Sequence, residues 1–147
     1  MTITKTSQTN PLPDRLEPML EALHQYWDGL RRGSEVMPYW DDLDMTRLAD
    51  LRANLLLLDV VDGGPRFRFS EAGAAIVDLV GSALRDYFID EVRLPEPLAG
   101  LFEQCQATVA DSAATYTRRD SHARLLLPLW GNGQIQMIIG AVEKVGR

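Results

Sequence analysis

The sequence has little cysteine, little histidine and no excess of basic charge. It contains one cysteine, Cys105, and two histidines among 147 residues. A single cysteine excludes an intramolecular disulfide, and without a CxxC or CxxCH pattern neither a zinc knuckle nor covalent haem is indicated. Acidic residues outnumber basic ones by 21 to 15, for a net charge of -6. Because nucleic-acid binding depends on a positive surface, we expect no nucleic-acid partner. The single cysteine fits a protein of a reducing compartment.

Long apolar runs are also missing. Unbroken apolar runs such as the four leucines at residues 55–58 are far shorter than the about 20 apolar residues that a bilayer span needs. Residues 1–10, MTITKTSQTN, lack the apolar centre of a signal peptide. We therefore expect no membrane association and a cytoplasmic location. With 46% hydrophobic residues, a chain of this length can bury the core of one domain.

The N-terminal region predicts a disordered tail over residues 1–13 and an amphipathic helix over residues 14–33. Asp14 and Glu17 have the spacing of a capping box, Pro18 either moves the start to about Glu17 or kinks the helix, and Gly33 ends it. Apolar residues recur at spacings of three and four, namely Leu16, Met19, Leu23, Tyr26 and Leu30. This stripe either packs on its own domain or forms the interface of a homodimer.

The rest of the chain alternates between strand and helix patterns. Phe67 and Phe69 alternate with polar residues, which predicts a strand with one buried face. Pro128 predicts either a bulge or a position that faces away from a ladder hydrogen bond. The expected elements are a short helix within residues 34–53, strands at 54–61 and 66–70, a helix at 74–80 ended by Gly81, a helix from about Pro97, and strands at 114–118, 123–130 and 134–143. Gly131, Asn132 and Gly133 join the last two strands in a tight turn.

This order predicts an α+β fold. We expect a five-stranded antiparallel sheet with helices inserted between strands 2 and 3, covered on one face, preceded by the N-terminal amphipathic helix. The space between sheet and helices is either packed solid or holds a ligand.

Several segments in this order resemble a bacterial PAS-domain family, catalogued as PAS-5. They are residues 27–33 with Met37 and Pro38, residues 57–60, residues 67–69 with Ala72 and Gly73, then Gly81, Leu84, residues 88–92 and residues 126–129. The resemblance implies a PAS-like domain over residues 34–147 with a sensory or regulatory role and no enzymatic activity. Ser70, Ala74 and the pair Arg85-Asp86 depart from the family pattern, so a pocket would differ from the family's or be absent.

Basic side chains gather around the turn before the fourth strand. Arg118, Arg119, His122 and Arg124 could together hold a carboxylate or phosphate, or they could simply balance nearby acids. The candidate ligand-binding residues are Trp40, Tyr87, Arg118, His122 and Arg124.

Other chemistries find less support. The acidic residues at 41–44 and 90–91 are oxygen donors, but their pattern lacks the glycine and distal glutamate of a calcium loop, so we predict no metal site. Residues 98–109 contain no histidine for haem, and Cys105 lies outside the Asn-Cys-Arg motif of flavin photosensors. Haem and flavin are therefore not expected, the cofactor is left unknown, and no catalytic residue is assigned.

The functional prediction is a stand-alone PAS-like sensory module of bacterial type. It would act through another signalling protein and as a homodimer through the N-terminal helix, and a small ligand between sheet and helices could modulate it. The alternative is a small-pocket α+β enzyme, similar in outline to isomerase-type cone folds, that uses a buried acid or His122.

Overall fold

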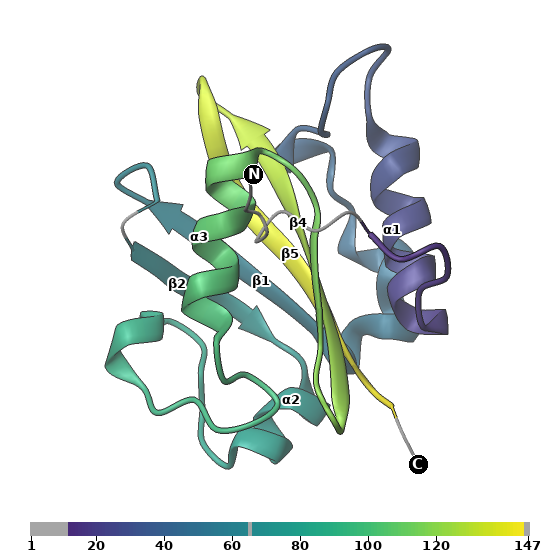
Figure 1. Ribbon diagram of the computed structural model, residues 1–147. Coiled ribbons are helices and arrows are strands. Elements are labelled where there is room, and N and C mark those ends of the chain that lie inside the picture. The colour runs from purple at the N-terminus through teal and green to yellow at the C-terminus, as the bar shows by residue number, and fades with distance from the viewer. Residues whose placement is uncertain (1–11, 65, 146–147) are drawn as a thin grey trace, which may run out of the picture.

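The chain forms the five-stranded antiparallel sheet that its sequence predicts, in a computed structural model that describes residues 12–64 and 66–145. The strands are β1 (Leu55–Val61), β2 (Arg66–Ala72), β3 (Thr115–Arg118), β4 (His122–Gly131) and β5 (Gln134–Lys144). Their order across the sheet is β2-β1-β5-β4-β3, so the first and last strands pair in its middle (Figure 1).

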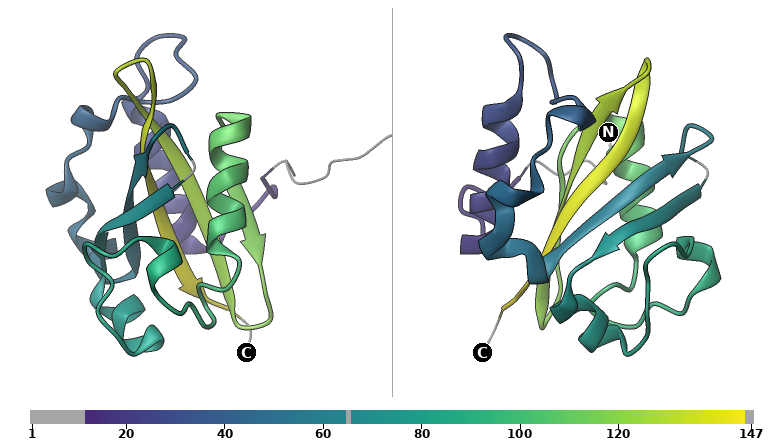
Figure 2. Two further views of the ribbon diagram at one scale, coloured as in Figure 1. Left: turned by 90° about the vertical axis from the view of Figure 1, so that its left-hand side faces the viewer. Right: turned by 180° about the vertical axis from the view of Figure 1, so that it is seen from behind.

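Helices cover both faces of this sheet, not the single face that the sequence predicts. Helix α2 (Ala74–Val80), the short 3-10 helix η4 (Ile89–Glu91) and helix α3 (Leu101–Asp111) lie between β2 and β3 in the chain, as predicted. Helix α1 (Pro18–Leu30) and the 3-10 helix η3 (Met45–Asn54) lie on the opposite face from α3 (Figure 2). Residues 123–129 of β4 are all buried, because each face of this strand meets a helix.

Helix α1 is shorter than predicted at both ends. Pro18 occupies its first turn and Glu17 is its N-cap residue, which confirms the later of the two predicted starts. The predicted capping box is wrong, because α1 has no side-chain cap and the Glu17 carboxylate instead accepts a hydrogen bond from the Tyr116 hydroxyl. The helix ends at Leu30, three residues before Gly33, because the backbone is already extended at Arg31.

The apolar face of α1 packs on the sheet of its own chain. Leu20 and Leu23 are fully buried, and Trp27 donates from Nε1 to the Pro128 carbonyl at 2.9 Å. The backbone amide of Met19 donates to the Glu143 carboxylate of β5 at 2.8 Å. Leu16 and Leu23 of the predicted stripe therefore lie in the core of their own domain, whereas Met19, Tyr26 and Leu30 are only partly buried.

Two predicted helices differ from those observed. The segment between α1 and β1 forms η2 (Trp40–Asp42) and η3, both 3-10 helices, where an α-helix was expected. Helix α3 begins at Leu101 and not near Pro97, because Leu98 is buried in the preceding loop and Gly100, with φ 80°, is the N-cap residue. Residues 1–11 of the predicted tail lie outside the described residues, and Leu12 packs against the core.

The strand and turn predictions hold elsewhere. Phe67 and Phe69 are buried, and the Phe67 ring meets that of Phe102 on α3 edge-on. Helix α2 has the predicted bounds and ends at Gly81, whose φ is 86°. Strand β4 has an irregular register between Leu129 and Trp130, next to Pro128, which is where the sequence predicts a bulge.

Candidate functional site

A cluster of buried polar side chains lies between α3 and the strands β3 and β4. Its members are Gln104 and Thr108 of α3, Thr115 of β3 and Arg124 of β4, all less than 9% exposed. The Thr108 and Thr115 hydroxyls are 2.7 Å apart, and Gln104 donates from Nε2 to the Thr115 hydroxyl at 3.1 Å. Such a cluster is unusual in a core because each buried polar group must find a partner.

Helix and strand periodicity places these residues together. Gln104 and Thr108 are four residues apart on α3 and therefore share its inner face. Thr115 and Thr117 alternate on β3, so both point to α3, and the register pairs Thr117 with Arg124. The Thr117 hydroxyl lies 3.4 Å from Gln104 Oε1. The cluster thus depends on the pairing of β3 with β4.

Arg124 carries the charge of the cluster. Its Nε donates to Gln104 Oε1 at 2.6 Å, and its Nη1 donates to the carbonyls of Pro97 and Ala99 at 2.9 and 3.2 Å. It forms no ion pair with any carboxylate in residues 12–64 and 66–145. The pKa of Arg124 is lowered to about 10, chiefly by burial and in smaller part by the nearby guanidinium of Arg119. A buried cation without a counterion is the most distinctive chemical feature of this domain.

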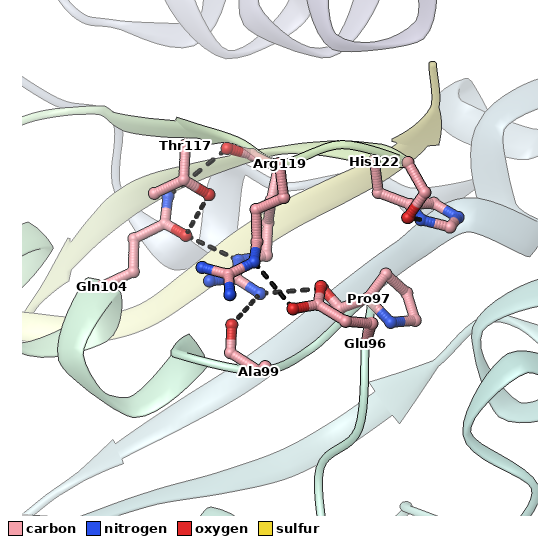
Figure 3. A network of polar contacts seen from close by, with 9 residues as sticks. Glu96, Pro97, Ala99, Gln104, Thr117, Arg119 and His122 are labelled. Carbon is pink, nitrogen blue, oxygen red and sulfur yellow. Dashed lines mark hydrogen bonds and ion pairs between the residues drawn. The ribbon is translucent and has the colours of Figure 1, made fainter. Parts of the chain in front are cut away.

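A cleft of about 450 Å³ opens beside this cation, between α3 and β3. It is hereafter called the α3–β3 cleft, and it is lined by Gly100, Glu103, Gln104, Ala107, Thr115, Tyr116, Thr117, Arg119 and Arg124. Figure 3 shows the Arg119 side chain extending over this group of residues toward Glu96. Arg119 donates from Nε to Glu96 Oε2 at 2.7 Å, and both side chains are about half exposed. The cleft therefore has one buried and one exposed guanidinium.

The predicted basic cluster is only partly formed. Arg124 and Arg119 reach the cleft, whereas Arg118 is on the other face of β3, 3.7 Å from the Glu17 carboxylate. His122 lies apart from the cluster in Figure 3, with Nδ1 2.8 Å from the Ser121 hydroxyl. Burial and the charge of Lys144 lower the pKa of His122, so it is neutral at neutral pH and adds no positive charge.

Trp40 and Tyr87 are not in this site. Trp40 lies against Gly131, the last residue of β4, whereas His122 is the first residue of this strand, which is about 30 Å long. The backbone carbonyl of Tyr87 accepts from the amide of Phe69 on β2, at the opposite edge of the sheet from β3. Of the five predicted ligand-binding residues, only Arg124 therefore lines the α3–β3 cleft.

The acidic segments have structural partners. Asp42 forms a two-point ion pair with Arg32. Asp44 accepts from the Thr46 hydroxyl and, as the cap of η3, from the Thr46 amide. Asp90 forms a two-point ion pair with Arg66. These hydrogen bonds hold the pKa of all three carboxyl groups below the ordinary value. Within residues 12–64 and 66–145 no group of three metal-ligating side chains comes together.

Cys105 is a core residue. It is fully buried on the inner face of α3, and burial raises the pKa of its thiol to about 12. A thiol in this state is protonated and unreactive at neutral pH. The enzyme alternative uses a buried acid or His122, but the buried ionisable group of the α3–β3 cleft is the cation Arg124, and His122 does not line this cleft. Asp111 has a buried Oδ2 without a partner among the described residues, and it is not one of the residues that line this cleft.

The residues that sequence reasoning missed are polar positions within apolar patterns. Gln104 and Thr108 lie among Leu101 and Cys105 on the buried face of α3, at spacings of three and four. A polar pair four residues apart on an apolar helix face is a signal that could have identified them. The sequence could not show that Thr115 would face the same pair, because that contact depends on the strand pairing.

A pH dependence follows from the environment of His122. Because its folded-state pKa lies below the ordinary value of 6.5, the unfolded chain binds more protons than the folded chain as the pH falls. The folded state should therefore lose stability through this group below about pH 6.5. We expect wild type to lose more unfolding free energy than His122→Gln between about pH 8 and pH 5 in urea titrations. Equal losses in the two proteins would contradict the assignment.

The strand order, with helices inserted between β2 and β3, is that of a PAS-like α+β domain. Residues 15–143 match the family model described as "PAS domain", and the chain therefore belongs to the PAS domain family. Domains of this family are sensory modules and generally lack enzymatic activity. In the part of the chain that the structure describes, no helix has the length and apolar character needed to cross a bilayer.

Among solved structures, one similar chain is described as "Flavin Analogue Sheds Light on Light-Oxygen-Voltage Domain Mechanism". It shares 19% sequence identity with this chain at a TM-score of 0.48, over 69% of this chain and 84% of its own length. A search of curated proteins gives no match.

Proposed function

We propose that this PAS domain is a regulatory module of the bacterial cytoplasm in which a small ligand in the α3–β3 cleft changes the association of the domain with other proteins. The observation that carries the proposal is the position of β3, whose two faces connect the cleft with the start of α1. Thr115 faces the cleft cluster, whereas the neighbouring Tyr116 donates its hydroxyl to the Glu17 carboxylate at 3.0 Å.

Strand β3 is suited to transmit a change because it is held on one side only. It has four residues and pairs only with β4 at the edge of the sheet. Short edge strands open at lower free-energy cost than central strands, which have partners on both sides. A ligand that displaces β3 would therefore also strain the Tyr116–Glu17 contact. Burial, and in smaller part the hydrogen bond to the Glu17 carboxylate, raises the pKa of Tyr116 to about 12.

The proposed interface between copies is the outer part of the α1 stripe. Leu16 and Leu23 are buried in the chain's own core and cannot contribute to it. Met19, Tyr26 and Leu30 are only partly buried, so they remain able to contact a second copy. A partner protein of another kind could use the same surface.

Self-association is tested by introducing a charge into this surface. We expect wild type to have the mass of a dimer in light scattering, and Leu30→Glu to have that of a monomer with an unchanged circular dichroism spectrum. Gln25→Glu is the matched control, because Gln25 is exposed on the same helix but lies at no three- or four-residue spacing from Met19, Tyr26 or Leu30, and it should stay dimeric. A monomeric wild type, or a dimeric Leu30→Glu, would refute the proposed interface.

The coupling through β3 is tested by hydrogen exchange of α1. Thr115→Val removes a buried hydroxyl from β3, and Thr108→Val removes its hydrogen-bonding neighbour from α3. We expect Thr115→Val to accelerate amide exchange in residues 19–21 about tenfold, corresponding to one lost hydrogen bond, with a much smaller effect of Thr108→Val. Equal effects would indicate general destabilisation and contradict the coupling.

A further inference from the structure

The unpaired part of the Arg124 guanidinium lies at the mouth of the α3–β3 cleft. Nε and Nη1 are used by Gln104, Pro97 and Ala99, whereas Nη2 makes no hydrogen bond to any residue in 12–64 or 66–145. Nη2 would lie 3.8 Å from a Cβ placed on Gly100, a cleft residue that has no side chain to cover it. A side chain only 3% exposed thus directs an unused donor into an open cleft.

The N-terminus of α3 meets this donor at the same place. Gly100 is the N-cap residue of α3, a helix of 11 residues, and no side chain caps it. The first amides of an uncapped helix carry a partial positive charge, which favours an anion. Two independent features, the free Nη2 of a buried arginine and an uncapped helix N-terminus, therefore converge on one point of the cleft.

The charges around the cleft select the kind of anion. Arg119 supplies a second guanidinium, but Glu96 is paired with it and Glu103 also lines the cleft. Two carboxylates close by repel a doubly charged phosphate more strongly than a singly charged group. A carboxylate also matches the planar donors of guanidinium groups. The volume of about 450 Å³ is in the range of small-molecule sites.

We propose that the α3–β3 cleft binds a small organic monocarboxylate between Arg124 Nη2, the Arg119 guanidinium and the N-terminal turn of α3. Glu96 is the internal carboxylate that occupies Arg119 when the cleft is empty, and it competes with the ligand. This inference rests on the proposed function only in taking the cleft as the ligand site, and it adds the chemical class of the ligand.

The test uses sodium propionate, lactate and benzoate as probes, with the neutral propionamide, lactamide and benzamide as controls and with sodium phosphate at constant ionic strength. Nuclear magnetic resonance titration of the full chain should show saturable shifts of the Gly100, Gln104 and Thr117 amides with at least one carboxylate. The neutral propionamide, lactamide and benzamide should give no such shifts. Phosphate should bind more weakly than that carboxylate.

Variants of the cleft make the assignment specific. Glu96→Gln should bind the carboxylate several-fold more tightly, because it removes the internal competitor, and Arg119→Gln should bind about tenfold more weakly. Arg119 is about half exposed, so this variant should fold. Arg93→Gln, which alters an exposed arginine that does not line the cleft, should bind like wild type.

Three results would overturn the inference: no saturable shift with any carboxylate in wild type and Glu96→Gln, equal shifts with the matched amides, or unchanged affinity in Arg119→Gln. Preferential binding of phosphate would also overturn the assignment to a carboxylate. The proposed function fails separately, if a carboxylate binds and neither the exchange of α1 nor self-association changes.

Discussion

Replacing Gly73 by alanine is expected to destabilise the domain by about 3 kcal/mol, the upper part of the range for overpacking. Gly73 lies between β2 and α2, and its amide donates to the Leu55 carbonyl at 2.8 Å. A Cβ at this position would overlap the backbone oxygens of Arg52 and Ala53 in η3. Because the colliding atoms belong to the backbone, no side-chain rotation relieves the overlap, and the contact between η3 and the start of α2 must open.

The measurement is urea unfolding of Gly73→Ala, followed by circular dichroism. Gly29→Ala is the matched control, because Gly29 is in α1 and a Cβ there would have no atom within 4 Å. Alanine favours a helix over glycine by up to about 1 kcal/mol, so this variant should be as stable as wild type or more stable. A Gly73→Ala protein as stable as wild type would show that the close approach of η3 is not required.

Replacing Arg124 by methionine is expected to destabilise the domain by about 2–4 kcal/mol. The guanidinium is the donor for Gln104 Oε1 and for the carbonyls of Pro97 and Ala99. Its loss leaves buried acceptors unpaired and detaches the segment before α3 from β4. Part of the cost is recovered, because a buried charge without a counterion is itself unfavourable.

A second substitution separates these effects. Gln104→Leu combined with Arg124→Met removes both ends of the strongest hydrogen bond, so the double variant should lose less stability than the sum of the single variants. Arg119→Gln, which removes an exposed ion pair, should change stability by less than about 1 kcal/mol. Urea titrations of wild type, the two single variants, the double variant and Arg119→Gln measure these differences. Additive losses in the double variant would show that Gln104 and Arg124 act independently.

The elements that the sequence predicts best are those whose signals are local. Helix α2 begins after Gly73 and ends at Gly81, and β2 shows its buried Phe67 and Phe69 by simple alternation. The start of α3 was misplaced because Pro97 is a good first-turn residue by local rules, whereas burial of Leu98 holds this segment outside the helix. Local preference yields to packing wherever a buried side chain fixes the backbone.

The candidate site was predicted in part. The sequence places Arg124 in a group of basic residues, but members of this group point to different faces of the sheet. Arg118 lies beside Glu17, whereas Arg124 lies beside Gln104. Alternation along a strand separates adjacent residues in space. Trp40 and Tyr87 are predicted in the same group, although Trp40 lies beside Gly131 at the end of β4 and Tyr87 lies beside Phe69 on β2.

The sequence by itself determined the strands, the order of the elements, the amphipathic N-terminal helix and the resemblance to the PAS family. These depend on patterns over a few residues or on the linear order of motifs. Only the tertiary structure decided that α1 covers the second face of the sheet and that Arg124 has no counterion among residues 12–64 and 66–145. Both facts depend on contacts between segments far apart in the chain, such as Trp27 with Pro128 and Gln104 with Arg124, which no local pattern encodes.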